Sequence, residues 1–439
     1  MIEPQKDTLP TDEEDCQAQV RFGLLGRTLG HSWSPAIHAQ LGSTPYTLFE
    51  REPEDVEAFV RKGSWQGLNV TIPYKRRAYE LADVRSDRAQ RLGVANTLVR
   101  RPDGSVYADN TDLAGFAWML DSFCKRALGG PAGQVLSEKP VIVLGSGGAS
   151  QAVQAALGDC GARVSVISRK GEDNYQNLVD RHADAVLVVN TTPVGMYPKC
   201  PASPLTDEQF RGLAALKGVV DVVYNPQRTG ICLQAERAGL PYESGLSMLV
   251  GQACRSSEQF LDTTFADERI VELTNLIRQK SGNVYFIGMP GVGKTSAARS
   301  LSRLLGRPFI DLDDAVHVAA GITASDYITQ HGEDAFRKLE SEVTAQYGAK
   351  SGLIVACGGG IVTRERNYDL IHQNGTIVLL RRPLDQLSTK GRPLSKSRGV
   401  ESLAKERGPL YEQWADLAID CTGSAASDAR LVQSLLGLS

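Results

Sequence analysis

The chain has 439 residues, which is more than one ordinary domain needs, so two or three domains are expected. A formal net charge of -3 and a pI near 6.1 leave no basic face for nucleic acid, and no apolar run approaches the roughly 20 residues that span a bilayer. The eight cysteines contain no C-x-x-C pair, which favours reduced thiols in a cytoplasmic protein over a disulfide framework or a zinc site.

The first part of the chain reads as an acidic tail followed by an α/β block. Residues 1–19 lack the charged-then-apolar layout of a signal peptide, and we expect them to be disordered. A strand is predicted over residues 20–25, and short strands and helices follow to residue 122. A connector rich in Gly, Pro and Ser, residues 129–140, then indicates a change of unit.

A glycine-rich turn after this connector predicts a dinucleotide-binding fold. Strands expected at 141–144 and 163–167 flank Gly145-Ser146-Gly147-Gly148-Ala149-Ser150, and further strands at 185–189 and 218–223 suit a parallel sheet. An acidic residue after the second strand would favour NAD, but the chain has Ser168-Arg169-Lys170 there. These cations suit a 2′-phosphate and favour NADP, the alternative being a solvated basic strand end.

A second glycine-rich loop predicts a nucleoside triphosphate site. Helices expected at 247–261 and 268–280 and a short break at 281–283 lead to a strand at 284–287. The following Gly288-Met289-Pro290-Gly291-Val292-Gly293-Lys294-Thr295-Ser296 contains the pattern G-x-x-x-x-G-K-[ST], and a helix is expected from 296 to 305. Backbone N–H groups from Gly291 onward would surround the phosphates, Lys294 would reach the β- and γ-phosphates, and Thr295 would hold Mg²⁺.

Seven ordered motifs between residues 21 and 262 resemble those of shikimate dehydrogenases. They are Ser32-Trp33-Ser34-Pro35, Asn69-Val70-Thr71-Ile72-Pro73-Tyr74-Lys75, Ala95-Asn96-Thr97, Asn110-Thr111-Asp112, Asn190-Thr191-Thr192-Pro193, Asp221-Val222-Val223-Tyr224 and Gly245–Ala253. The resemblance implies NADPH-dependent reduction of 3-dehydroshikimate to shikimate. It departs at Leu113, where the family usually has glycine.

The same resemblance implies roles for single residues. Lys75 would donate a proton to the carbonyl oxygen, and Asp112 would orient it. Ser32 and Ser34 would hold the substrate carboxylate, and Tyr224 would line the pocket. The ring hydroxyls would be bound by Thr71, Asn96, Asp112 and Gln252. The cofactor would lie on Gly145–Ala149 and Ser168–Lys170, with Asp87, Val222 and Gly245 near it. Taken singly, each of these residues would be explained as a helix cap or a surface charge.

From residue 283 to about residue 420 the chain resembles shikimate kinases. The motifs are Phe309-Ile310-Asp311-Leu312-Asp313, Gly332-Glu333-Asp334-Ala335-Phe336-Arg337, Gly358-Gly359-Gly360, Arg392-Pro393-Leu394 and Glu406-Arg407-Gly408-Pro409-Leu410-Tyr411. The resemblance implies phosphorylation of shikimate by ATP with Mg²⁺. The lid, Ser388-Thr389-Lys390-Gly391, is short and has Lys390 where the family often has arginine.

Roles in this second site also follow from the resemblance. Arg337 and Arg407 would clamp the carboxylate of the acceptor, which a planar guanidinium does better than lysine. Asp313 would bind ring hydroxyls and take the proton, and Asp311 would support Mg²⁺. The acceptor ring would approach the backbone at Gly359 and Gly360, and Arg392 would neutralise the phosphoryl group from the lid.

The sequence as a whole predicts an α/β protein with a tail at 1–19, a substrate-binding domain at 20–122 with return helices at 247–280, a Rossmann-like NADP domain at 123–246 and a P-loop kinase domain at 283–439. The predicted activity is bifunctional, in two consecutive steps of chorismate and aromatic amino acid biosynthesis. The expected partners are small molecules, without nucleic acid or membrane, and a homodimer is an assembly that the sequence allows.

Two alternatives remain open at this point. The first is a dehydrogenase that takes quinate with NAD, against which Arg169 and Lys170 argue. The second is a metabolite-binding regulator of the kind that fungal quinate-pathway repressors represent. Such a regulator would be expected to lack catalytic groups, whereas Lys75, Asp112, Lys294 and Asp313 are all present in this chain.

Overall fold

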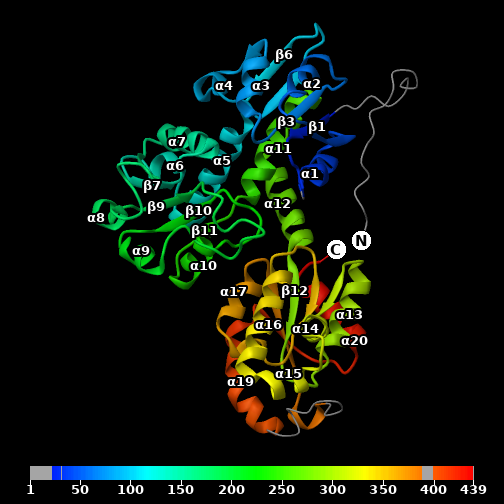
Figure 1. Cartoon of the computed structure of the whole chain (residues 1–439). Coiled ribbons are helices and arrows are strands. Elements are labelled where there is room, and N and C mark those ends of the chain that lie inside the picture. The colour runs from blue at the N-terminus through cyan, green and yellow to red at the C-terminus, as the bar shows by residue number, and fades with distance from the viewer. Residues whose placement is uncertain (1–21, 31, 388–398, 439) are drawn as a thin grey trace, which may run out of the picture. The chain divides into compact units, whose positions relative to one another are not determined.

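The computed structural model describes residues 22–30, 32–387 and 399–438 (Figure 1). The chain divides into two compact units, residues 1–118 with 250–273 and residues 119–249 with 274–439. It passes between the units inside three helices, α5 (Thr111–Phe123), α11 (Leu246–Leu261) and α12 (Asp267–Ser281). The tail expected at 1–19 and the lid at 388–391 with Arg392 lie outside the described residues.

The first unit contains a mixed six-stranded sheet with strand order β2-β1-β3-β5-β6-β4. Only β5 is antiparallel to its neighbours. Buried side chains such as Trp65 and Leu68 belong to the hydrophobic core of this unit. Its elements are β1 (Phe22–Gly26), α1 (Ser34–Leu41), β2 (Tyr46–Glu50), α2 (Val56–Lys62), β3 (Gly67–Val70), α3 (Lys75–Leu81), β4 (Val84–Arg85), α4 (Asp87–Leu92), β5 (Thr97–Arg100) and β6 (Val106–Asp109).

The second unit begins, after α5 and a π-helical turn (Cys124–Leu128), with a parallel five-stranded sheet of order β11-β10-β9-β7-β8. Every residue of β9 and β10 is buried, as expected for parallel strands covered on both faces. The elements are α6 (Ala132–Val135), β7 (Pro140–Leu144), α7 (Gly148–Asp159), β8 (Arg163–Ile167), α8 (Leu178–His182), β9 (Leu187–Asn190), α9 (Asp207–Gly212), β10 (Gly218–Asp221), α10 (Gly230–Arg237) and β11 (Tyr242–Glu243).

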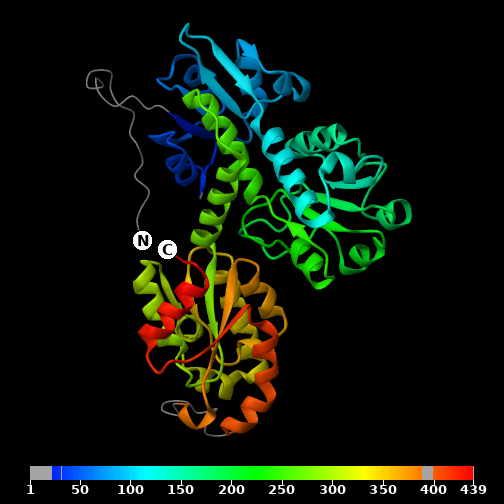
Figure 2. The same ribbon diagram turned by 180° about the vertical axis from the view of Figure 1, so that it is seen from behind.

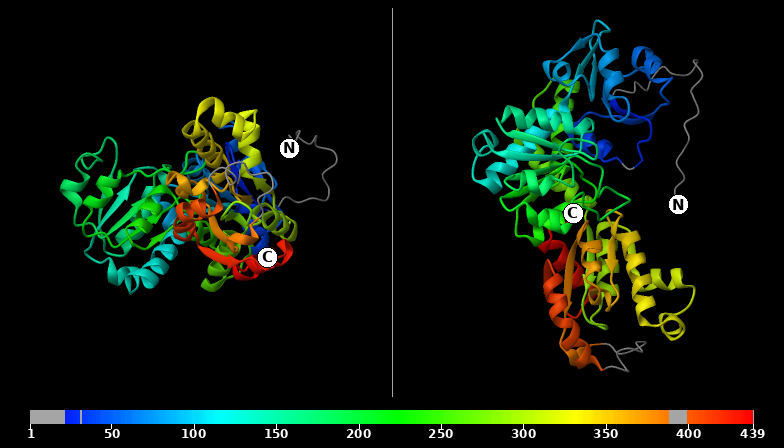
Figure 3. Two further views of the ribbon diagram at one scale, coloured as in Figure 1. Left: turned by 90° about the horizontal axis from the view of Figure 1, so that it is seen from below. Right: turned by 60° about the vertical axis from the view of Figure 1, so that its left-hand side comes forward.

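The rest of the second unit is a parallel sheet of order β13-β14-β12-β15-β16 between two helical layers (Figure 3). Val284 and Phe286 belong to the core that α13 and α20 cover, while Tyr285 and Ile287 belong to the core that α14 and α16 cover. The elements are β12 (Asn283–Ile287), α13 (Lys294–Leu305), β13 (Phe309–Asp311), α14 (Leu312–Ala320), α15 (Ala324–His331), α16 (Glu333–Gly348), β14 (Ile354–Ala356), α17 (Arg366–His372), β15 (Gly375–Arg381), α19 (Val400–Trp414), β16 (Leu417–Asp420) and α20 (Ala425–Leu435), with 3₁₀ turns at Ile361–Thr363 and Leu384–Gln386.

The predicted α/β class is confirmed, and the element boundaries differ by a few residues for local reasons. The strand expected to reach Val223 ends at Asp221, whose carboxylate accepts the Val223 N–H at 2.9 Å and turns the chain. The helix expected from Ser296 begins at Lys294, directly after Gly293 with a φ of 113°. Only Gly282 separates α12 from β12. The helix therefore leads almost directly into the strand (Figure 2). Within the described ranges, no helix is both long and apolar enough to cross a membrane.

Candidate active sites

The loop between β12 and α13 is shaped by its glycines. Gly288, Gly291 and Gly293 have φ values of 135°, 94° and 113°, in the region that favours glycine. A side chain at Gly288 would also meet the carbonyl oxygen of Leu380 at 2.6 Å. The loop therefore turns sharply and leaves the first N–H groups of α13, which have no acceptor within the helix, available to an anion.

Lys294 and Thr295 are the first two residues of α13. Lys294 Nζ donates to the carbonyl oxygens of Gly288 at 2.9 Å and Met289 at 3.2 Å, which places the ammonium against the loop. Thr295 Oγ1 donates to Asp311 Oδ2 at 2.9 Å. This hydroxyl and carboxylate fit Mg²⁺, which takes few protein oxygens and keeps several waters. The described residues contain no cluster of three or more His, Cys, Asp or Glu that could hold a metal.

A cleft of about 370 Å³ lies beside this loop, and most of the residues predicted for the kinase site line it. The predicted residues that line it are Gly291, Gly293, Lys294, Thr295, Ser296, Asp313, Arg337, Gly359, Gly360 and Arg407. Val292 does not line it, because its side chain is in the core and its N–H donates to Met289. Asp311 is not among the lining residues; its side chain accepts the Asp313 N–H at 3.0 Å and caps the start of α14.

Two buried arginines give the cleft a positive wall. Arg337 is 5% exposed, and its Nη1 donates to Glu340 Oε2 at 2.8 Å. Arg407 is 3% exposed, and its Nη1 donates to the Gly359 carbonyl oxygen at 3.0 Å. With Lys294, the lining holds three cations against the two carboxylates of Asp313 and Glu340. Because buried charge is costly without a counterion, this wall fits an anionic ligand.

The three glycines after β14 make room for the side chains that face the cleft. A side chain at Gly360 would meet Arg337 Nη1 at 2.1 Å, and one at Gly358 would meet Asp313 Oδ1 at 2.4 Å. A side chain at Gly359 would meet Pro290 of the phosphate loop at 2.9 Å. The glycines therefore set where the arginine, the aspartate and the loop can lie, in addition to the predicted approach of a ligand ring.

Glu340 is a residue of this site that the sequence motifs did not include. It lines the cleft and is 4% exposed. Burial raises the pKa of Glu340, and the neighbouring Arg337 opposes that rise. Burial likewise raises the pKa of Asp313, whose carboxylate is crowded by the cleft walls although solvent still reaches it, and Lys294 opposes the shift. The one sequence signal for Glu340 is its i,i+3 spacing from Arg337, which by itself reads as a surface ion pair.

In the first unit, the starts of two helices bring Lys75 and Asp112 together. Lys75 is the first residue of α3 and Asp112 the second of α5, and Lys75 Nζ donates to Asp112 Oδ2 at 2.6 Å. Their side chains are 26% and 17% exposed, so the pair is shielded yet reachable. Such a pair can deliver a proton to a bound carbonyl. Leu113, where the family usually has glycine, continues α5 and buries its side chain.

Asn96 connects this pair to helix α11. It is 3% exposed, and its Oδ1 accepts the Thr111 N–H at 2.6 Å. Its Nδ2 lies 3.5 Å from Gln252 Oε1, which is a weak contact. The structure thus brings Asn96 and Gln252 together. Three more of the predicted substrate residues lie in this unit: Ser34 at the start of α1, Ser32 two residues before it, and Thr71 directly after β3.

Backbone N–H groups of two of these residues make hydrogen bonds that place the segment. Ser34 is buried at the start of α1, and its N–H donates to Ser32 Oγ at 3.2 Å. Thr71 follows β3, where its N–H donates to the Leu25 carbonyl oxygen at 2.9 Å. The Thr71 methyl packs against Gly26, since a side chain there would meet it at 2.8 Å. The Ser32 hydroxyl thus lies beside the start of α1, and the backbone of Thr71 is held beside β1.

In the second unit, the carboxyl ends of β7, β8 and β9 form a cleft of about 590 Å³. Of the predicted cofactor residues it contains Gly145, Ser146, Gly147, Ser168 and Arg169. Gly145 has a φ of 99°, and a side chain there would meet Thr192 at 2.9 Å, so the turn requires glycine. This cradle fits the pyrophosphate of a dinucleotide at the start of α7, where Gly148 and Ala149 lie. Lys170 is exposed and outside the lining.

Several residues of this cleft had no predicted role. They are Tyr175, Thr191, Thr192, Pro193, Val194, Ser203 and Pro204. The signal that could have found three of them is the Asn-Thr-Thr-Pro run directly after a buried strand. Because ligands of open parallel sheets bind at the carboxyl ends of the strands, such a run belongs beside the glycine turn.

The end of β10 is held by a buried carboxylate. Asp221 accepts from Asn190 Nδ2 at 3.0 Å and from Thr229 Oγ1 at 2.6 Å. Burial raises the pKa of Asp221 to about 6, and these hydrogen bonds oppose the shift. Gly245 approaches the same strand end so closely that a side chain would meet the Val222 carbonyl oxygen at 2.1 Å. Two more predicted residues lie elsewhere. Tyr224 is half-buried, shortly after the end of β10 in the second unit. Asp87 is exposed at the start of α4 in the first unit.

Two family models match the chain in two separate ranges. The model described as shikimate dehydrogenase substrate binding domain matches residues 24–98, and the model described as shikimate kinase matches residues 290–436. The first range contains Ser32, Ser34, Thr71, Lys75 and Asn96, and the second contains the cleft beside the phosphate loop.

The chain is also similar, over most of their length, to proteins named shikimate dehydrogenase (NADP(+)). It is 32% identical over 258 residues to the shikimate dehydrogenase (NADP(+)) of Clostridium beijerinckii, which covers 54% of this chain and 90% of that protein. It is 37% identical over 268 residues to that of Caulobacter vibrioides, covering 55% and 89%.

Solved structures give the same result. Shikimate dehydrogenase 1 from Peptoclostridium difficile matches with 32% identity and a TM-score of 0.51, over 59% of this chain and 97% of that one. A chorismate mutase/shikimate 5-dehydrogenase fusion protein from Clostridium acetobutylicum matches with 33% identity and a TM-score of 0.53, over 60% and 97%.

Proposed function

Because the chain belongs to the shikimate dehydrogenase family and carries a shikimate kinase domain after it, we propose that it reduces 3-dehydroshikimate to shikimate with NADPH and then phosphorylates shikimate to shikimate 3-phosphate with ATP and Mg²⁺. The product of the first reaction is the acceptor of the second. The observation that carries the proposal is the cleft in which Asp313, Arg337 and Arg407 face the phosphate loop, because this set fits a small anionic polyol.

In the reduction, the carbonyl oxygen of 3-dehydroshikimate gains negative charge and needs a proton. Lys75 is the donor in our proposal, and Asp112 orients its ammonium from 2.6 Å. Asn96, Gln252 and Thr71 bind ring hydroxyls, and the hydroxyls of Ser32 and Ser34 bind the carboxylate. NADPH supplies the hydride when it is bound.

The choice of NADPH over NADH is assigned to Arg169. Arg169 lines the cleft at the carboxyl end of β8, where no acidic residue stands to bind a free ribose hydroxyl. A guanidinium there can form charge-assisted hydrogen bonds with the 2′-phosphate. The same feature argues against quinate dehydrogenation with NAD.

Replacing Arg169 with alanine is expected to weaken NADPH binding by about 10- to 150-fold, since hydrogen bonds to charged groups contribute about 1.5–3 kcal/mol. NADH binding should change little, because that cofactor has no 2′-phosphate. Dissociation constants from titration calorimetry measure both. Arg163→Ala, at the opposite end of β8, is the control and should bind NADPH normally. An equal loss for NADH and NADPH would refute the assignment.

In the phosphorylation, positioning and charge neutralisation carry the reaction. Arg337 and Arg407 hold the shikimate carboxylate, and Asp313 accepts the proton of the attacking hydroxyl. Lys294 and the N–H groups at the start of α13 stabilise the phosphates, while Thr295 and Asp311 support Mg²⁺. Arg392, outside the described residues, is assigned by resemblance alone to the transferring group. ATP supplies the phosphoryl group when it is bound.

As the pH is lowered, the rate of phosphorylation should begin to fall at a higher pH than it would if the base were an aspartate with an ordinary pKa. Burial raises the pKa of Asp313, and the proposed base is active only when ionised, so activity is lost as pH falls through this raised value. Asp313→Asn should lower kcat by about 10²–10⁴-fold and flatten this limb. The pH profile of phosphorylation of added shikimate measures both. An unchanged acid limb in Asp313→Asn would assign the titration to another group.

The direct test of the proposed function gives the purified chain 3-dehydroshikimate, NADPH, ATP and Mg²⁺ and identifies the products by mass spectrometry. We expect shikimate and then shikimate 3-phosphate. Without NADPH, neither shikimate nor shikimate 3-phosphate should form. If shikimate is then added, only the formation of shikimate 3-phosphate should return. Binding of these compounds without turnover would favour a regulator, and turnover of quinate with NAD in their place would favour the other alternative.

The cellular location and assembly are also proposals. We place the enzyme in the cytoplasm because the seven cysteines among the described residues are free, and thiols stay reduced there. A homodimer stays a prediction from the sequence. Light scattering would measure the mass of the purified protein in solution, which is then compared with the 47.4 kDa mass of one copy.

A further inference from the structure

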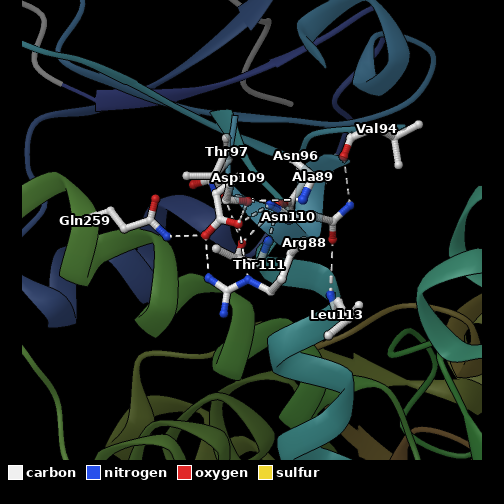
Figure 4. Close-up of polar contacts among 12 residues, drawn as sticks. Arg88, Ala89, Val94, Asn96, Thr97, Asp109, Asn110, Thr111, Leu113 and Gln259 are labelled. Carbon is white, nitrogen blue, oxygen red and sulfur yellow. Dashed lines mark hydrogen bonds and ion pairs between the residues drawn. The ribbon is translucent and has the colours of Figure 1, made fainter. Parts of the chain in front are cut away.

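The carboxylate of Asp109 is buried where β6 ends, and five hydrogen-bond donors surround it (Figure 4). Its Oδ1 accepts from Arg88 Nε at 3.2 Å, from the Ser86 hydroxyl and from the Asn110 N–H at 2.7 Å. Its Oδ2 accepts from Arg88 Nη2 and from Gln259 Nε2 at 2.6 Å. Asp109 is 1% exposed, so these donors take the place of water.

Arg88 supplies the positive charge among these donors. Its side chain is 43% exposed and covers Asp109 from the solvent side. Burial would by itself raise the pKa of Asp109, but hydrogen bonds from Arg88 and Ser86 outweigh burial and hold that pKa below its ordinary value. A buried carboxylate that loses its cation is strongly destabilised. The position of Asp109 therefore depends on Arg88.

Asp109 stands directly before the turn that carries Asp112. The N–H of Asn110 is fixed by the Asp109 carboxylate at 2.7 Å, and the N–H of Thr111 is fixed by Asn96 Oδ1 at 2.6 Å. Figure 4 shows these side chains converging on the junction of β6 and α5. Asp112 follows as the second residue of α5. The backbone position of Asp112 therefore depends on these two hydrogen bonds at consecutive residues. The first of them is the bond from the Asn110 N–H to the Asp109 carboxylate.

Helix α11 reaches the same junction at two positions. Gln252 contacts Asn96 at 3.5 Å, and Gln259 donates to Asp109 at 2.6 Å. Residues seven apart lie on nearly the same face of a helix, so one face of α11 supports both members of the junction. Asp109 is where α4, β6 and α11 meet, and Arg88 is the contribution of α4.

We propose that Arg88 and Asp109 are positioning residues for the reduction of 3-dehydroshikimate, because their ion pair holds the junction of β6 and α5 so that Asp112 faces Lys75. Neither residue touches the reacting atoms. The inference rests on the proposed function, since it takes Lys75 and Asp112 as the catalytic pair. Loss of the ion pair would let the junction shift, and a misplacement of about 1 Å can cost about 100-fold in rate.

The test measures kcat and KM of both activities for Arg88→Ala, Arg88→Lys and Asp109→Asn. For Arg88→Ala we expect kcat of the reduction to fall by about 10- to 100-fold, with KM for 3-dehydroshikimate nearly unchanged. Arg88→Lys should recover part of kcat, and added methylguanidinium should restore part of it to Arg88→Ala, because the arginine site opens to solvent. Phosphorylation of added shikimate and the melting temperature report on folding in the same sample.

Arg61→Ala is the matched control. Arg61 is 44% exposed, pairs with Asp83 at 3.2 Å in the same unit and makes no contact with the junction, so its loss should leave both activities unchanged. A kcat for Arg88→Ala equal to that of Arg61→Ala would overturn the proposal. So would a parallel fall of both activities, or a rise in KM without a fall in kcat, because these outcomes indicate a purely structural role.

Two further variants keep the outcomes separate. If Arg88→Ala does not fold, Arg88→Gln keeps hydrogen-bond donors and removes the charge, and it should show the same selective fall in kcat, whereas a normal kcat would overturn the proposal. Lys75→Ala is measured alongside. A dehydrogenase that stays active without Lys75 would refute the proposed function itself, while an inactive Lys75→Ala beside a fully active Arg88→Ala would refute only this inference.

Discussion

Replacement of Lys75 by alanine is expected to lower kcat for NADPH-dependent reduction of 3-dehydroshikimate by about 10²–10⁴-fold, the usual contribution of a positioned acid. The physical reason is that the ammonium, 2.6 Å from Asp112, is the proposed source of the proton for the developing alkoxide. Phosphorylation of added shikimate should be unchanged, because Lys75 lies outside the kinase cleft. Spectrophotometry of NADPH and a coupled assay of ADP formation give the two rates.

Lys62→Ala is the control for this experiment. Lys62 is an exposed residue at the end of α2 in the same unit, and its loss should leave both rates as they are. Asp112→Asn should resemble Lys75→Ala more closely than Lys62→Ala, because it removes the charge that orients the ammonium. If Lys75→Ala removed both activities, the picture of two independent sites would be wrong, and if it removed neither, another group would have to supply the proton.

Replacement of Lys294 by methionine is expected to have the reverse effect. Phosphorylation of shikimate should fall by about 10²–10³-fold, as when one donor to a developing negative charge is removed. The methionine stem keeps the volume of the lysine but cannot neutralise the phosphates. Reduction of 3-dehydroshikimate should continue, so that shikimate accumulates when NADPH and ATP are both present. Chromatography of the products measures this accumulation directly.

Arg303→Ala provides the comparison for Lys294→Met. Arg303 is an exposed cation near the far end of the same helix, α13, and contacts neither the loop nor the cleft. Both activities should survive its loss. Normal phosphorylation by Lys294→Met would rule out the proposed role of the loop, and loss of the reduction as well would indicate that the variant had disturbed the whole second unit.

The phosphate loop is the part of this chain that could be predicted most completely from the sequence. Its shape depends on neighbouring residues, because the left-handed φ values of Gly288, Gly291 and Gly293 are local properties of the backbone. The turn at Gly145 is similar, because its φ of 99° is also a local property of the backbone. Local chemistry also favoured NADP, through Arg169 at the end of β8.

The acceptor side of the kinase cleft could be named only through resemblance. Asp313 belongs to α14, Arg337 to α16 and Arg407 to α19, while Gly359 follows β14. No spacing along the chain predicts that residues so far apart meet. Glu340 was absent from the prediction because its spacing from Arg337 is that of an ordinary surface pair, and only the packing of α16 against the cleft buries it.

The α/β class, the two glycine-rich turns and the residues that resemble two families could all be predicted from the amino-acid sequence alone. These follow from hydrophobic pattern, backbone preference and short motifs, each of which acts over a few residues. Three contacts could be known only from the folded chain: Thr192 lies against Gly145, Glu340 pairs with Arg337, and Arg88 pairs with Asp109. A buried charge must find a partner, and the fold supplies that partner from whichever distant segment packs beside it.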